Sequence, residues 1–94
     1  MKNFIVSYDL NGAHPTHAEM DRHIQQGCLK YARILETVWY VKRSGTAAEL
    51  SNYLSRILSP NDRLMVVEGT AAVFQNLLVQ DQAVIDEWNN RLAA

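Results

Sequence analysis

Asp9, the acid that ends the apolar run FIVSYD, is the residue of this sequence with the clearest chemical potential. It precedes the turn signal Asn11-Gly12, which would place its carboxylate at the end of a strand. Carboxylate oxygens suit Mg²⁺, but one carboxylate per chain is too few for tight binding. Two-fold symmetry in a homodimer could bring two copies of Asp9 together. The alternative is structural, with Asp9 accepting hydrogen bonds from the backbone amides of Asn11 and Gly12.

Three histidines, His14, His17 and His23, follow soon after Asp9. Histidine binds metals and shuttles protons near neutral pH. The run from His14 to Thr16 also matches an H-x-T element of some phosphoesterases, but those enzymes place two copies around one phosphate and this chain has one. His17 and His23 are six positions apart, so a helix does not put them on one face. The spacing therefore favours exposed, solvated histidines.

Basic residues near aromatic ones indicate a possible contact with RNA or DNA. Lys42 and Arg43 follow the aromatic pair Trp39-Tyr40. Cations bind phosphates and aromatic rings stack on bases. Adjacent strand residues point to opposite faces, so only one of Lys42 and Arg43 can serve. Trp39 in mid-strand fits a core or interface better than a base platform. Further cations that could contact phosphate are Lys30, Arg33 and Arg56.

Composition narrows the class of protein. Nine basic and ten acidic residues among 94 give a net charge of −1, so any nucleic-acid site must be a local patch. Cys28, the single cysteine, can form no internal disulfide and is expected to be a small buried hydrophobe. No run approaches the roughly 20 apolar residues of a membrane span, and no signal peptide is recognisable. We therefore expect a cytoplasmic protein without membrane contact.

Local patterns predict the elements that position these residues. Residues 3–10 alternate as a strand, with the even positions from Phe4 on one face and the odd positions from Ile5 on the other. Capping boxes at Thr16 and Thr46 predict the starts of two helices. The first helical stripe runs from Met20 as far as Tyr31, with Gly27 as a weak point near which the helix could end.

The later patterns are strands and a helical tail. Residues 32–42 are rich in β-branched and aromatic side chains and predict one long strand that bends near Glu36-Thr37. Residues 63–68 (RLMVVE) have apolar side chains at both alternating sets of positions, as in a central strand. Residues 71–74 predict a short edge strand, and residues 80–94 a C-terminal amphipathic helix.

This order of elements predicts one α+β domain over residues 1–94. Two capped helices between strands favour a ferredoxin-like α/β sandwich (strand-helix-strand-helix-strand core) with both helices on one face of the sheet. The other face would carry Ile5 and part of the aromatic strand, which is too apolar to stay in water. We therefore expect a dimer or the C-terminal helix to cover that face.

The segments FIVSYDL, ILETVWYVKRSGTAAEL and NDRLMVVEGT resemble the SinR-like small proteins, relatives of the CRISPR-associated ferredoxin-like nucleases, and are similar to the virulence-associated protein D toxins. The resemblance covers roughly residues 2–70, and the tail around Asp86-Glu87-Trp88 is similar to the SinR-like tail. It implies a homodimer. It also implies a metal-dependent phosphodiesterase in which Asp9 of each subunit holds a Mg²⁺ ion that activates water.

Two departures from the nucleases decide between the functions that this resemblance implies. The loop LNGAHPTH has none of the arginines that usually follow the Tyr-Asp turn, and the net charge is slightly negative. We therefore favour a small dimeric protein that associates with nucleic acid in an interaction or scaffolding role. The alternatives are a Mg²⁺-dependent ribonuclease or nuclease that pairs Asp9 across a homodimer, and a regulator or inhibitor that binds a protein through the tail helix.

Overall fold

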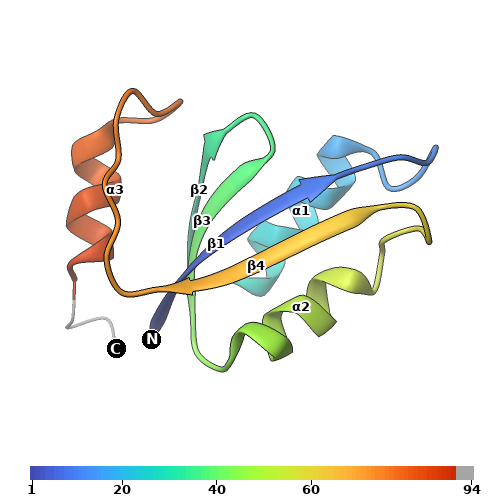
Figure 1. Ribbon diagram of the computed structural model, residues 1–94, viewed down its shortest axis with the longest axis horizontal. Helices are drawn as coiled ribbons and strands as arrows, with labels where there is room; N and C mark the ends of the chain where they lie inside the picture. The colour runs from blue at the N-terminus through green and yellow to red at the C-terminus, as the bar shows by residue number, and fades with distance from the viewer. Residues whose placement is uncertain (91–94) are drawn as a thin grey trace.

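The computed structural model describes residues 1–90, and Figure 1 shows how their helices and strands are arranged. The described elements, in chain order, are β1 (Lys2–Asp9), α1 (His17–Gly27), β2 (Lys30–Leu35), β3 (Val38–Arg43), α2 (Ala47–Ser55), β4 (Arg63–Gly69) and α3 (Asp81–Trp88). The strands form one antiparallel sheet in the order β2-β3-β1-β4. The predicted α+β class is therefore confirmed. No helix in this part of the chain is both long and apolar enough to cross a bilayer.

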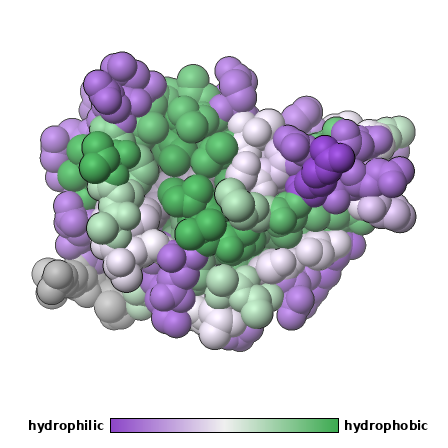
Figure 2. Space-filling model, in the orientation of Figure 1, coloured by the Kyte–Doolittle hydropathy of each residue, from purple (hydrophilic) through white to green (hydrophobic). Residues whose placement is uncertain are grey.

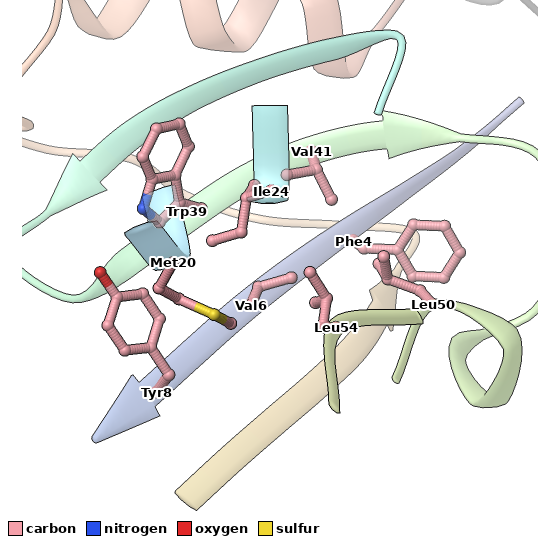
Figure 3. Packing of buried hydrophobic residues seen from close by; sticks show 9 residues of the cluster. All are labelled: Phe4, Val6, Tyr8, Met20, Ile24, Trp39, Val41, Leu50 and Leu54. Carbon is pink, nitrogen blue, oxygen red and sulfur yellow. The ribbon is translucent and has the colours of Figure 1, made fainter. Parts of the chain in front are cut away.

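The main core lies between the sheet and the helices α1 and α2. The strand β1 presents Phe4, Val6 and Tyr8 to these helices, as the alternation predicts. Figure 3 shows side chains from β1, β3 and the two helices meeting in this layer. The buried residues of this core, all labelled in Figure 3, are Phe4, Val6, Tyr8, Met20, Ile24, Trp39, Val41, Leu50 and Leu54. Cys28 is half-buried against this core, and burial raises the pKa of its thiol to about 11.

The helix α3 packs on the opposite face of the sheet. Val84 and Trp88 of α3 form a second buried cluster with Ile34 of β2 and Tyr40 of β3. In Figure 1 the sheet runs between α3, at the left, and the pair α1 and α2. The expectation that the C-terminal helix covers this face is confirmed for the part formed by β2 and β3. Residues 91–94 of the predicted tail lie outside the described residues.

The predicted long strand over residues 32–42 is wrong, because the chain reverses there. The strand β2 ends at Leu35, Glu36 and Thr37 form a turn, and β3 returns antiparallel with Val38 opposite Leu35. Enrichment in β-branched and aromatic residues marks extended backbone but does not distinguish one long strand from a hairpin. The helix α1 ends at Gly27, the weak point of the predicted stripe, and Tyr31 lies on β2 instead.

Two expectations about the C-terminal third are also wrong. The strand β4 is an edge strand, whereas apolar residues on both faces predicted a central one. Its inward residues pack on the main core, while Met65 and Val67 remain 56% and 44% exposed. Residues 71–74 form no strand. The pattern identifies residues that avoid water, but only the neighbouring elements determine which of them are covered.

Both predicted capping boxes are present. The Thr16 hydroxyl accepts from the Glu19 amide at 3.2 Å, and the Glu19 carboxylate accepts from the Thr16 amide at 2.8 Å. The same reciprocal pair joins Thr46 and Glu49 at 3.0 and 3.1 Å. His14 Nδ1 lies 3.1 Å from Glu19 Oε1, the oxygen that accepts from the Thr16 amide. The start of α1 is thus fixed by contacts within six residues.

The capping box of α1 predicts a pH dependence. Hydrogen bonding by the Thr16 amide, followed by His14, lowers the pKa of Glu19 from 4.5 to about 2. Because the folded-state pKa is depressed, the charged carboxylate stabilises the fold above about pH 4.5, and this contribution is lost as the pH falls toward 2. A Glu19→Gln variant keeps a capping side chain that cannot titrate. Melting temperatures of the two proteins should therefore converge on acidification; parallel curves would contradict this assignment.

Candidate functional site

Asp9 lies exposed at the end of β1, on the sheet face that α1 and α2 do not cover. It stands opposite Arg63 of β4, beside a shallow pocket of about 140 Å³ that also includes Met65. Within residues 1–90, no hydrogen bond or ion pair reaches its carboxylate. The alternative role of Asp9, accepting from the backbone of the turn at Asn11-Gly12, is taken by Asp62. The Asn11 amide donates to Asp62 Oδ1 at 2.7 Å.

Asp62 therefore performs the turn role that the sequence left open for Asp9. Its second oxygen accepts from the Ser59 amide at 2.7 Å. These backbone bonds, that from Asn11 first, hold the pKa of Asp62 below its ordinary value. Asp62 thus joins the loop after β1 to the loop before β4. The Asp9 carboxylate takes no part in this turn and has no hydrogen-bond or ion-pair partner within residues 1–90.

Lys42 is buried, with 2% of its surface exposed. Its ammonium donates to the carbonyl oxygens of Glu87 at 2.6 Å and Asn90 at 3.0 Å, and lies 3.4 Å from Glu87 Oε1. Carbonyls at a helix C-terminus lack intrahelical partners, and a cation satisfies them well. Lys42 thus holds the end of α3 on the sheet, and its charge is not accessible to a phosphate in this arrangement.

Arg43 lies on the opposite face, as the alternation requires, and is half-buried against α2. Its guanidinium carbon is 5.7 Å from the centre of the Tyr53 ring, and that of Arg56 is 5.5 Å from the same centre. His23 stacks on this ring at 4.1 Å. His23 Nε2 lies 2.8 Å from the Tyr53 carbonyl, and the Tyr53 hydroxyl donates to the His23 carbonyl at 2.7 Å. These contacts join α1 to α2.

The three histidines do not form a common site. His14 and His17 are exposed, as the spacing predicts, but His23 is half-buried in the contact with Tyr53. Among residues 1–90, no three or more His, Cys, Asp or Glu side chains lie close enough together to hold a metal ion. Within the described part of one chain, Asp9 therefore belongs to no such group of metal ligands.

A polar cluster that the sequence did not predict lies at the same end of β1, on the helix side. The Tyr8 hydroxyl donates to Asp21 Oδ1 at 2.6 Å, and Trp39 Nε1 donates to the same oxygen at 3.2 Å. Burial, followed by the bond to Asp21, raises the pKa of Tyr8 above its ordinary value. We call the adjoining cavity of about 320 Å³ the Asp21 pocket. Its lining residues are Tyr8, His17, Asp21, Arg33, Glu36 and Thr37.

The edge strand β2 borders the Asp21 pocket through Arg33, and farther along this strand the Leu78 amide donates to the Ile34 carbonyl at 3.0 Å. Tyr31, which is 47% exposed, and Arg33 share the helix-side face of β2, since they pair with Val41 and Trp39. The Tyr31 ring lies 6.2 Å from that of Trp39. Within residues 1–90 the ion pair and the hydrogen bond of Arg33 both go to Glu36: Nη1 lies 3.8 Å from Glu36 Oε2 and 3.5 Å from the Glu36 carbonyl oxygen. The Arg33 side chain is about half exposed, and that of Glu36 is largely in water.

The sequence indicates the two residues unequally. Arg33 is among the cations that could contact phosphate, which stays a prediction, whereas the helical stripe predicted to reach Tyr31 ends before it. The alternation within KYAR was the signal that could have placed both on one face of a strand. Asp21 follows His17 by four positions, which puts both on one side of a helix, but nothing local indicates that Tyr8 and Trp39 reach it.

No protein-family model, no curated protein and no solved structure matches the chain.

Proposed function

We propose that this protein is a small ferredoxin-like domain that associates with single-stranded RNA or DNA as a dimer, in an interaction or scaffolding role. The strand order β2-β3-β1-β4, with one helix after β1 and one after β3, agrees with the ferredoxin-like arrangement. The observation that carries the nucleic-acid proposal is the exposed Tyr31 ring beside Arg33 on the edge strand β2.

This edge offers the two groups that bind single strands without needing a duplex. An aromatic ring stacks on any base, at about 1–3 kcal/mol per base, and a cation contacts the backbone phosphates. Tyr31 and Arg33 lie on the same face of β2, two positions apart. Lys30 is exposed on the other face of the same edge. The protein's net charge of −1 makes such a local patch necessary.

Binding of short labelled oligonucleotides, followed by fluorescence anisotropy at low salt, tests this proposal. Tyr31→Ala should weaken binding by roughly 5- to 150-fold, as the loss of one stacked base implies. The single variant Arg33→Gln should also weaken binding, and it should reduce the salt dependence of binding. Arg63→Gln is the matched control, since Arg63 is an exposed cation on the far edge strand. Absence of binding, or equal effects of the two arginine variants, would refute the proposed surface.

The dimer is supported by apolar surface that α3 leaves uncovered. Met65 and Val67 of β4 are exposed on the face that also carries Ile5, Ser7 and Asp9. Figure 2 shows hydrophobic residues gathered over the middle of the molecule, between α3 and the hydrophilic right-hand end. A second copy that packs its own β4 face here would bury these side chains, and the burial of apolar surface stabilises association.

A second candidate function is the Mg²⁺-dependent ribonuclease or nuclease. The observation that favours it is the exposed Asp9 carboxylate, which no described residue engages and which borders the same uncovered face. The donor set of one chain is incomplete for Mg²⁺, so this candidate requires Asp9 from a second copy.

Cleavage of labelled RNA and DNA with Mg²⁺ or with chelator tests the second candidate. Asp9→Asn should abolish metal-dependent cutting, whereas Asp86→Asn, at an exposed acid on α3, should leave it unchanged. Cutting that survives Asp9→Asn would exclude this mechanism. A monomer at micromolar concentration, measured by analytical ultracentrifugation, would exclude it as well, because a lone carboxylate does not supply the site.

A further inference from the structure

We infer that the Asp21 pocket receives one unpaired nucleobase and that Asp21 accepts a hydrogen bond from the amino group of that base. This inference rests on the proposed association with single strands and adds the class of base: adenine, cytosine or guanine, which carry an exocyclic amino group, in preference to uracil.

The first argument is the bonding of the Asp21 carboxylate. Both the Tyr8 hydroxyl and the Trp39 indole donate to Oδ1, and within the described residues Oδ2 takes no hydrogen bond. Two donors on one oxygen fix the orientation of the carboxylate. An ionised carboxylate only accepts hydrogen bonds, so a ligand of Oδ2 must donate. A carboxylate that accepts from the amino group of cytosine is a known mode of base recognition.

The second argument is the distribution of charge around the pocket. Asp21 and Glu36 bring two acids to its lining, which repels a phosphate from the interior. Arg33 also lines the pocket, and its loose contacts with Glu36 leave it available for a phosphate outside. The arrangement therefore favours a base inside the pocket and the sugar-phosphate backbone along β2.

The third argument is size and surroundings. At about 320 Å³ the pocket is at the lower end of the range of ligand pockets, which suits a single ring system. The Tyr8 ring lies 5.9 Å from that of His17, and both residues line the pocket. The exposed ring of Tyr31 is next to Trp39, whose indole supports Asp21. One base can thus occupy the pocket while its neighbour stacks on Tyr31.

The ligand itself provides a test that does not depend on the folding of a variant. The wild-type protein should bind short oligocytidine more tightly than oligouridine by about three- to tenfold, as one hydrogen bond implies. Oligomers of N4,N4-dimethylcytidine, which has no amino hydrogen, should lose this advantage. Equal binding of oligocytidine and oligouridine would overturn the inference and leave the proposed surface intact. Absence of binding to every oligomer would refute the proposed function as well.

An isosteric variant provides the second test. Asp21→Asn keeps an oxygen that accepts from Tyr8 and Trp39 and places an amino group at the other position, where it donates. The preference should then shift toward oligouridine, whose O4 accepts. Urea unfolding of the variant confirms that the fold is retained. An unchanged cytidine preference in the folded variant would show that Asp21 only supports Tyr8 and Trp39, and would overturn the inference.

Discussion

Replacing Lys42 with methionine is expected to lower the free energy of unfolding by about 2–4 kcal/mol and to loosen α3 from the sheet. Methionine keeps an apolar stem of similar length but cannot donate to the carbonyls of Glu87 and Asn90. The half-buried Glu87 carboxylate would also lose its cation at 3.4 Å. Urea unfolding measures the total loss, and amide hydrogen exchange should show increased opening confined mainly to α3.

Lys30→Met is the matched control for this prediction. Lys30 stands opposite Lys42 on the neighbouring strand β2 and belongs to the same class of side chain, but it is exposed. The same chemical change there should alter stability little. If the two variants lose equal stability, the cost comes from removing a lysine from the sheet, and the role of Lys42 in holding α3 is refuted.

Trp88→Ala is expected to cost about 3–5 kcal/mol, the usual range for removing a large buried aromatic ring. Only 9% of Trp88 is exposed, and its ring lies 5.6 Å from that of Tyr40 and 5.5 Å from that of Phe74. The sheet is shaped to receive it at Gly69, where an added Cβ would lie 2.5 Å from the ring. Thermal and urea unfolding measure the effect.

Two further variants test whether the stability lost in Trp88→Ala comes from the packing of the indole ring or would follow any substitution in α3. Trp88→Phe keeps an aromatic ring and should recover much of the stability that alanine loses. Gly69→Ala should destabilise the protein from the sheet side, because its methyl group occupies the place of the indole. If Gly69→Ala had no effect, the close approach of Trp88 to β4 would be contradicted.

The contacts of Lys42 with the end of α3 and of Trp88 with the sheet make α3 part of the fold. This bears on the alternative that the tail helix binds another protein. The apolar residues Val84 and Trp88 face the chain's own sheet. A protein partner at this helix would have to bind its outer surface or displace it. Apolar surface remains uncovered at β4, where Met65 and Val67 are exposed and Met65 borders the same pocket as Asp9.

The candidate sites differ in how far the sequence could locate them. Asp9 was placed correctly, because alternation along a single strand fixes both its face and its position at the strand end. Lys42 was expected to contact phosphate, yet it is buried under α3. Asp21 was not singled out, since its importance depends on Tyr8 and Trp39 from two other elements.

The local features of this protein could be predicted from single segments of its sequence: the capped starts of α1 and α2, the two faces of β1 and, from the order of these segments, the α+β class. Capping and alternation depend on residues within a few positions of each other, so a single segment carries the whole signal. The strand order, the burial of Lys42 and the hydrogen bonds from Tyr8 and Trp39 to Asp21 arise only when the elements pack together. These depend on which face packs against which element, a property of the assembled chain that no short segment contains.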